Sequence, residues 1–139
     1  MSNFTINHIG LAVPSIAEFL RENEFLYGDF SKGSLITNPV QRVNEMFISD
    51  GATVIELLEP AGDDSPINGF LKRNRAGGLI HIAFDVDHLE SCLEEIDKRG
   101  GKTVVEPVPD PAFQNRRIAF AVFNGHLVEL IERTHAGVA

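Results

Sequence analysis

The sequence contains the same pattern twice, and this repeat limits what the chain can fold into more than any other feature. Segment 7–13 (NHIGLAV) resembles segment 80–86 (IHIAFDV), and segment 53–59 (TVIELLE) resembles segment 126–132 (HLVELIE). Both resemblances have the same offset, 80 − 7 = 126 − 53 = 73 residues. A shared offset over two separate segments indicates a duplicated structural module rather than a chance match.

The repeat includes ionisable residues. The offset relates His8 to His81 and Glu56 to Glu129, so each histidine precedes its glutamate by 56 − 8 = 129 − 81 = 48 residues. The surrounding residues are apolar, which predicts strands in a covered sheet. A carboxylate in such a strand needs a cation, a hydrogen-bond network or a metal ion, because burying an isolated charge costs several kcal/mol or forces protonation.

We predict an α+β fold of two tandem βαβββ modules, with each module reading as strand, helix and three strands. A single domain over 1–139 is expected to comprise module one at 4–59, a linker helix within 60–77, module two at 78–133 and a short C-terminal tail at 134–139. In module one, Ser15 is expected to cap a helix. In the linker, Ser65 is expected to act as N-cap and Pro66 as the first position of a short helix over 67–74.

The second module has clearer local signals. Leucine and isoleucine spacing predicts a helix over 88–99. A short strand is expected at 102–106, followed by a proline-rich loop over 107–114. Asn124-Gly125 predicts a type I′ hairpin between strands 116–123 and 126–133.

Composition excludes several classes of protein. The formal charge of −8 argues against nucleic acid as the main partner, since phosphate binding requires a basic surface. No apolar run approaches the ~20 residues that cross a bilayer, and the first residues lack the features of a secretory leader. One cysteine, Cys92, precludes an internal disulfide and a cysteine-based zinc site. We therefore expect a cytoplasmic protein with a small-molecule substrate and no membrane association.

Each histidine is predicted to have a small residue beside it on the same strand face. Strand alternation puts Gly10 on the same face as His8 and Ala83 on the same face as His81, with bulky residues on the opposite faces. Two imidazoles and two carboxylates suit a divalent transition metal. The alternative is that two core histidines merely hydrogen-bond to two core glutamates, but the repetition favours the metal.

With these residues the chain resembles the vicinal oxygen chelate (glyoxalase/bleomycin resistance/dioxygenase) superfamily. It is most similar to the methylmalonyl-CoA epimerase branch. The resemblance rests on residues 7–13, 55–60, 65–74, 77–87, 117–120 and 127–130.

The resemblance implies curved mixed sheets around a metal-binding cleft, with His8, Glu56, His81 and Glu129 as ligands of one divalent ion (Co, Mn, Ni or Zn). It also implies that Glu129 and Glu45 act as acid and base on opposite sides of the α-carbon of a metal-chelated thioester. Three regions depart from the branch: Ile80 replaces a usual histidine, and segments 18–33 and 109–115 match poorly.

The expected function is therefore that of a metal-dependent isomerase acting on methylmalonyl-CoA or another thioester. Arg116, Arg117 and Arg42 are candidates for binding an anionic substrate. A glyoxalase I-type lactoylglutathione lyase would use the same ligands, and an antibiotic-binding protein of the same fold is a non-catalytic alternative. An extradiol dioxygenase is disfavoured because Glu56 would be a superfluous ligand to its iron. We expect a homodimer, because open curved sheets leave edges to cover.

Overall fold

The computed structural model describes residues 4–133 of the chain, so the predicted tail at 134–139 lies outside the described residues. The chain divides into two compact units. We call residues 8–80 the N-terminal unit, and residues 4–7 together with 81–133 the C-terminal unit. The first and sixth strands each contribute residues to both units.

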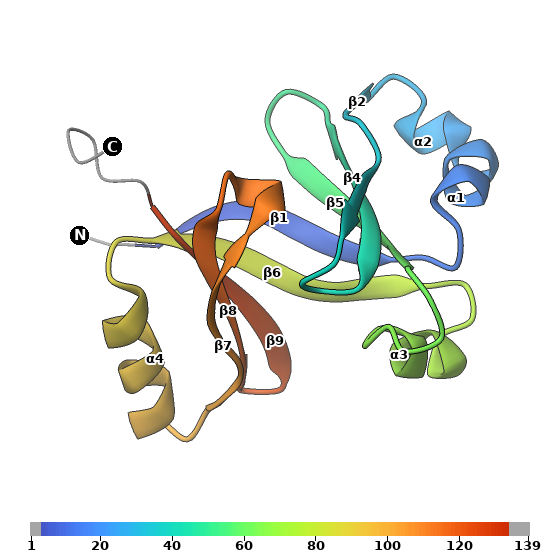
Figure 1. Ribbon diagram of the computed structural model, residues 1–139. Helices are drawn as coiled ribbons and strands as arrows, with labels where there is room; N and C mark the ends of the chain where they lie inside the picture. Colours follow the sequence, from blue (N-terminus) through green and yellow to red (C-terminus); the bar gives the residue numbers. More distant parts are fainter. Residues whose placement is uncertain (1–3, 134–139) are drawn as a thin grey trace. The chain divides into compact units, whose positions relative to one another are not determined.

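The N-terminal unit has a mixed sheet with the strand order β2-β4-β5-β1, and β3 pairs with β4 (Figure 1). β1 runs parallel to β5, whereas β4 is antiparallel to β5. The elements are β1 (Thr5–Ala12), α1 (Ile16–Glu22), α2 (Glu24–Tyr27), β2 (Ser31–Lys32), β3 (Ile36–Asn38), β4 (Val43–Ser49), β5 (Val54–Pro60) and α3 (Asn68–Arg73).

The C-terminal unit repeats this arrangement with the strand order β6-β9-β8-β7. β6 is parallel to β9, and the β7–β8 and β8–β9 pairs are antiparallel. Its elements are β6 (Gly78–Val86), α4 (Leu89–Lys98), β7 (Lys102–Asp110), a 3₁₀ turn (Pro111–Phe113), β8 (Arg116–Phe123) and β9 (His126–Glu132). The predicted α+β class with curved, mixed sheet is confirmed.

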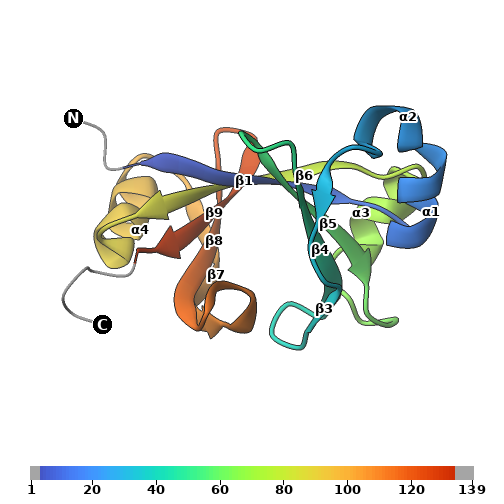
Figure 2. The same cartoon turned by 90° about the horizontal axis from the view of Figure 1, so that it is seen from above.

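In each unit, one helix packs against the bulky face of the sheet. Leu11 and Val13 lie in an apolar cluster with Ile16 of α1. In the C-terminal unit, Phe84 and Val86 cluster with Leu89 at the start of α4, which lies along one side of β6 to β9 (Figure 2). The predicted division into a bulky face toward the helix and a face of small residues beside each histidine is therefore observed.

The turns follow their local sequence signals. Asn124 and Gly125 both adopt positive φ, 48° and 80°, as a type I′ hairpin requires. The Ser15 side chain accepts a hydrogen bond from the Glu18 N–H and caps α1 as predicted. In the described part of the chain, 4–133, no helix has the length and apolar character to span a membrane.

The loop predicted over 107–114 is wrong for its first half, because β7 continues to Asp110. Pro107 and Pro109 have no N–H to donate, which a strand at the end of the sheet tolerates. The register with β8 shifts between Thr103 and Val105, and again between Val105 and Val108. These irregularities interrupt the alternation that identifies strands in a sequence.

The linker helix lies within one residue of its predicted range at both ends, but its N-cap differs from the prediction. α3 starts at Asn68 with Ile67 as its N-cap, and no side chain caps it. The Ser65 carbonyl instead accepts a hydrogen bond from the Asn68 N–H, so Ser65 and Pro66 form a turn that leads into the helix. The interior residues of this linker pack on the sheet: Ile67 joins Ala12 and Leu58 in an apolar cluster.

Candidate metal-ligand pairs

In the N-terminal unit, β1 and β5 bring a histidine and a glutamate into contact. Glu56 lies opposite Gly10 in the parallel register. His8 precedes Gly10 by two residues and therefore lies on the same face of the sheet. His8 Nε2 is 3.1 Å from Glu56 Oε1, and both side chains are almost completely buried. Phe47, which lies opposite Glu56 on β4, sets its ring edge-on to the imidazole with 5.5 Å between centroids.

The C-terminal unit holds an equivalent pair. Ala83 lies opposite Glu129, as Gly10 does opposite Glu56. His81 Nε2 is 3.3 Å from Glu129 Oε1, and both side chains are buried. Phe120 lies opposite Glu129 on β8, and its ring meets the His81 imidazole edge-on with 5.4 Å between centroids. The repeat seen in the sequence is thus a repeat of side-chain geometry.

Gly10 and Ala83 explain why the imidazoles fit. Each occupies the strand position directly opposite the glutamate, and both are buried. A large side chain at either place would compete with the carboxylate for room above the sheet. The pairs therefore depend on the small residues that strand alternation predicts beside each histidine.

Both pairs have a donor set that suits a transition metal. Histidine nitrogen and carboxylate oxygen bind such ions at about 2.0–2.2 Å. Two ligands at that distance, separated by an octahedral or tetrahedral angle, lie about 2.8–3.6 Å apart, and the observed separations of 3.1 and 3.3 Å fall in this range. The longer one exceeds the usual 2.7–3.2 Å for an N–H···O hydrogen bond.

Glu45 is a third buried carboxyl group and lies on the ligand-bearing face of the N-terminal unit. It is opposite Leu58 on β5, two positions along β4 from Phe47, and its exposed fraction is 0%. The Asn38 amide donates a hydrogen bond of 3.3 Å to Glu45 Oε1. Asn38 is a residue that sequence analysis missed.

Asn38 has a fixed orientation. Its side-chain oxygen accepts hydrogen bonds from the backbone N–H groups of Val40 and Gln41, at 3.0 and 3.1 Å. Turning the amide over would lose both bonds, so the NH₂ group remains directed at Glu45. Glu45 therefore accepts a hydrogen bond from an amide group whose orientation is fixed.

Arg117, one of the candidates for binding an anionic substrate, lies in a network of ion pairs. Its guanidinium binds Glu90 of α4 and Glu132 of β9 at 2.5–3.1 Å, on the helix-covered face. These hydrogen bonds hold the pKa of Glu90 below its usual value and raise the pKa of Arg117 further. Both carboxylates lie on the face opposite His81 and balance the charge of this arginine.

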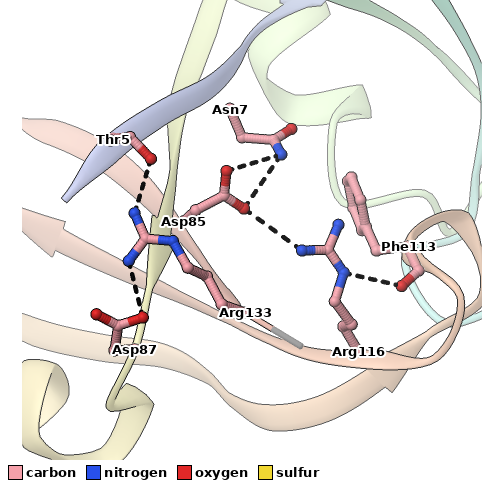
Figure 3. Close-up of polar contacts among 7 residues, drawn as sticks. All are labelled: Thr5, Asn7, Asp85, Asp87, Phe113, Arg116 and Arg133. Atoms are coloured by element: carbon pink, nitrogen blue, oxygen red, sulfur yellow. Dashed lines mark hydrogen bonds and ion pairs between the residues drawn. The ribbon is translucent and has the colours of Figure 1, made fainter. Parts of the chain in front are cut away.

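Arg116 has a different environment, shown in Figure 3. Its Nη1 lies 3.5 Å from Asp85 Oδ1, its Nε donates to the Phe113 carbonyl, and its guanidinium lies 5.9 Å from the centre of the Phe113 ring. Asn7 also donates to the Asp85 carboxylate at 3.2 Å. Strand alternation puts Arg116 on the same face as Phe120, and therefore on the ligand-bearing face of this unit.

Arg133 extends this polar cluster, binding Asp87 at 3.0 Å and the Thr5 hydroxyl at 2.8 Å (Figure 3). Arg42, the remaining candidate, is half-exposed and lies 3.6 Å from Asp64. Its backbone has φ of 57°, outside the adjoining strand conformation.

Two βαβββ units that each present a buried histidine–glutamate pair define a class of two-module proteins with metal-ligating residues at matching strand positions. The chain belongs to the Glyoxalase/Bleomycin resistance protein/Dioxygenase superfamily, whose family model matches residues 7–120. The resemblance inferred from the sequence is confirmed.

Curated relatives place the chain near one branch. It is 33% identical over 103 residues to the human protein named methylmalonyl-CoA epimerase, mitochondrial, covering 74% of this chain and 58% of that protein. The chain thus spans somewhat more than half the length of this relative. It is 32% identical over 128 residues to ethylmalonyl-CoA/methylmalonyl-CoA epimerase of Cereibacter sphaeroides, covering 90% of this chain and 95% of that protein.

A solved structure from the same branch has a similar fold. A variant of Streptomyces coelicolor methylmalonyl-CoA epimerase in complex with 2-nitronate-propionyl-CoA is similar with a TM-score of 0.77 and 27% identity. The match covers 96% of this chain and 100% of that one. The comparison of sequences and the comparison of structures therefore indicate the same branch of the superfamily.

Proposed function

We propose that this protein is an epimerase that inverts the α-carbon of an acyl-CoA thioester, with methylmalonyl-CoA or a close homologue as substrate. The observation that carries the proposal is the pair of buried His–Glu sets at equivalent strand positions. The names of the relatives, and the acyl-CoA analogue bound in the similar Streptomyces coelicolor structure, support the substrate class.

We propose further that His8, Glu56, His81 and Glu129 together hold one divalent ion, of Co, Mn, Ni or Zn. Each offers one ligand atom, and all four are buried. When bound, such an ion polarises a thioester carbonyl and stabilises the negative charge that develops as the α-proton leaves. Two neutral imidazoles add no charge to the site, and two carboxylates balance the double positive charge of the ion.

In this proposal, Glu45 and Glu129 move the protons. One carboxylate takes the α-proton, and the other, in its carboxylic acid form, delivers a proton to the opposite face. The stereocentre inverts, and the two glutamates end with exchanged protonation states. The Asn38 amide keeps Glu45 in place. Of the three predicted arginines, we retain Arg116 for the free carboxylate of the substrate, because it lies on the same face of the sheet as Phe120 and His81.

Solvent-exchange kinetics test the proposal. In deuterated water, the metal-loaded protein is expected to epimerise methylmalonyl-CoA and to incorporate deuterium at the α-carbon, as followed by NMR. The Glu45→Gln variant is expected to lose about 10²–10⁴-fold in epimerisation, yet to exchange the α-proton of one epimer without inversion, because Glu129 still removes it.

The Glu106→Gln variant is the matched control, because Glu106 is an exposed glutamate on β7. Equal epimerisation rates for Glu45→Gln and Glu106→Gln would remove Glu45 from the mechanism. Absence of any α-proton exchange by the metal-loaded protein would overturn the epimerase assignment. Turnover of the hemithioacetal of methylglyoxal and glutathione in its place would establish the glyoxalase I-type alternative.

A further inference from the structure

Arg116 begins β8 on the ligand-bearing face of the C-terminal unit, and two neighbouring elements hold its guanidinium there (Figure 3). In the turn before β8, the Phe113 carbonyl accepts a hydrogen bond of 3.2 Å from Nε, and the Phe113 ring centre lies 5.9 Å from the guanidinium carbon. On β6, Asp85 Oδ1 lies 3.5 Å from Nη1. These contacts fix the orientation of a long side chain that has many rotamers in solvent.

The Asp85 carboxylate is itself held in place. Asp85 follows Ala83 by two residues on β6, so it lies on the same face, about 7 Å along the strand. Ala83 is the residue opposite the candidate ligand Glu129. The Asn7 amide donates to both Asp85 oxygens at 3.2 Å. Asp85 therefore ties Arg116 to a fixed point near the candidate ligands.

Arg116 keeps the capacity to bind a further anion. A guanidinium has more N–H donors than the contacts with Phe113 and Asp85 use. The 3.5 Å contact with Asp85 is also longer than the about 2.7–2.9 Å of a charge-assisted hydrogen bond. Arg117, in contrast, makes its bonds to two carboxylates at 2.5–3.1 Å on the opposite face.

Asp110 is a buried acidic residue that the proposed chemistry does not use. Its exposed fraction is 0%, and it lies directly opposite Arg116 in the β7–β8 register, on the ligand-bearing face. Its Oδ1 accepts a hydrogen bond of 2.9 Å from the Ala112 N–H and caps the 3₁₀ turn that contains Phe113. Its carbonyl accepts another from the Asn115 N–H at 3.0 Å. Asp110 thus fixes the turn that holds the arginine.

Asn38 has the equivalent place in the N-terminal unit. It is also fully buried and ends its strand, and its side-chain oxygen accepts a hydrogen bond from the N–H two residues further on. The separation from Asp110 is 110 − 38 = 72 residues, one short of the repeat offset, because the turn after Asp110 is one residue longer. Asn38 holds Glu45 in one unit, whereas Asp110 holds the turn of Phe113 in the other.

We propose that Asp85 and Asp110 are positioning residues for Arg116, and that the oriented arginine makes the site selective for acyl groups with a free carboxylate. This role rests on the proposed function, in which Arg116 binds that carboxylate. Asp85 acts through its ion pair with Arg116, and Asp110 acts through the turn at Phe113. A neutral acyl group gains nothing from the arginine, so the preference depends on how the guanidinium is oriented.

Kinetics with one substrate and one inhibitor test the role of Asp85. Asp85→Ala is expected to raise KM for methylmalonyl-CoA about tenfold, which corresponds to about the strength of one charge-assisted hydrogen bond. The value of kcat should stay unchanged, because the carboxylate is bound equally in the ground state and the transition state. The Ki of propionyl-CoA, which lacks the free carboxylate, should also stay unchanged. Asp85→Asn keeps an oxygen acceptor for Arg116 and should restore most of the loss. An unchanged or lower KM for Asp85→Ala would contradict the proposal.

Asp87→Ala is the matched control, because Asp87 is two residues further along and pairs with Arg133 instead. It should change neither KM nor Ki. In the Arg116→Ala background, Asp85→Ala should have no further effect, since a positioning residue acts through the residue that it holds. Additive effects of these two substitutions, or an equal KM change for Asp87→Ala, would overturn the assignment.

Two substitutions test the path through the turn. Asp110→Ala and Phe113→Leu should each raise KM for methylmalonyl-CoA and leave the Ki of propionyl-CoA unchanged. Phe113→Leu keeps an apolar side chain at a buried position, so it tests the path even if Asp110→Ala does not fold. An unchanged KM for Phe113→Leu, or an equal rise in KM and Ki, would remove Asp110 from the proposal.

A binding measurement separates this inference from the proposed function. Calorimetric titration of the metal-loaded protein with malonyl-CoA and with propionyl-CoA needs no turnover. We expect tighter binding of malonyl-CoA, with the preference reduced about tenfold by Asp85→Ala but not by Asp87→Ala. That result supports the positioning role even if methylmalonyl-CoA is not epimerised. Equal preferences in all three proteins, or no preference in any, would overturn it.

Discussion

Asn38 has two hydrogen-bonding roles that one substitution can separate. Its oxygen holds the turn at Val40 and Gln41, and its nitrogen holds Glu45. Asn38→Asp keeps the acceptor for the turn but removes the donor and brings a second carboxyl group beside Glu45. Like charges at that distance oppose ionisation of both groups.

We expect Asn38→Asp to lower kcat for epimerisation and to shift its pH profile, because the ionisation of Glu45 changes. Asn38→Ala should instead lower the free energy of unfolding by about 1–3 kcal/mol, because buried partners lose their bonds. Urea denaturation and kcat–pH profiles measure the two effects. Thr37→Val is the control, because it removes only the exposed Thr37–Asn44 bond. Identical pH profiles for Asn38→Asp and Thr37→Val would contradict the positioning role.

Among structural elements, the β8–β9 hairpin and α3 place glycine in opposite situations. Gly125 has φ of 80° with open space around its Cβ position, whereas Gly69 lies inside α3, and a Cβ there would have Arg73 Nη1 at 3.8 Å as its nearest neighbour. The first position needs glycine for its backbone conformation, and the second does not.

The same substitution should therefore have opposite signs at the two positions. Gly125→Ala is expected to lower the free energy of unfolding by about 1 kcal/mol or more, and Gly69→Ala to raise it by about 0.4–1 kcal/mol. Thermal denaturation of the two variants measures both. Stabilisation by Gly125→Ala would show that the hairpin does not require positive φ there.

For the molecule as a whole, metal binding should be linked to folding. An ion that binds only the folded chain stabilises it by about 2.7 kcal/mol at a free concentration of 100 Kd. Chelation should lower Tm correspondingly, and readdition of Co, Mn, Ni or Zn should restore it. His8→Ala and His81→Ala should abolish the effect equally, since the two pairs are equivalent.

His126→Ala provides the comparison, because this exposed histidine starts β9 and belongs to neither pair. It should retain the full metal-dependent shift in Tm and one bound ion per chain by elemental analysis. A metal response that survives His8→Ala or His81→Ala would mean that the ion binds elsewhere. The homodimer, the cytoplasmic location and the module boundaries stay predictions.

The duplicated sequence is sufficient to predict most of the fold and the identity of the candidate ligands. His8, Glu56 and their counterparts are recognisable because buried polar residues in apolar strands stand out locally, and duplication makes the same local signal appear twice. Helix positions and the Asn124-Gly125 hairpin are local in the same sense, since capping and turn preferences act over a few residues.

Contacts between distant segments were decided only by the tertiary structure. Arg117 looked available in the sequence, but α4 and β9 bring two carboxylates to it. Asn38 has no polar counterpart at the repeat offset, and its role depends on the register between β3 and β4. The position of β7 at the end of the sheet tolerates its prolines, so the strand continues where its composition predicted a loop. Such outcomes depend on which strands pair and which helix covers them, and spacing along the chain does not contain that information.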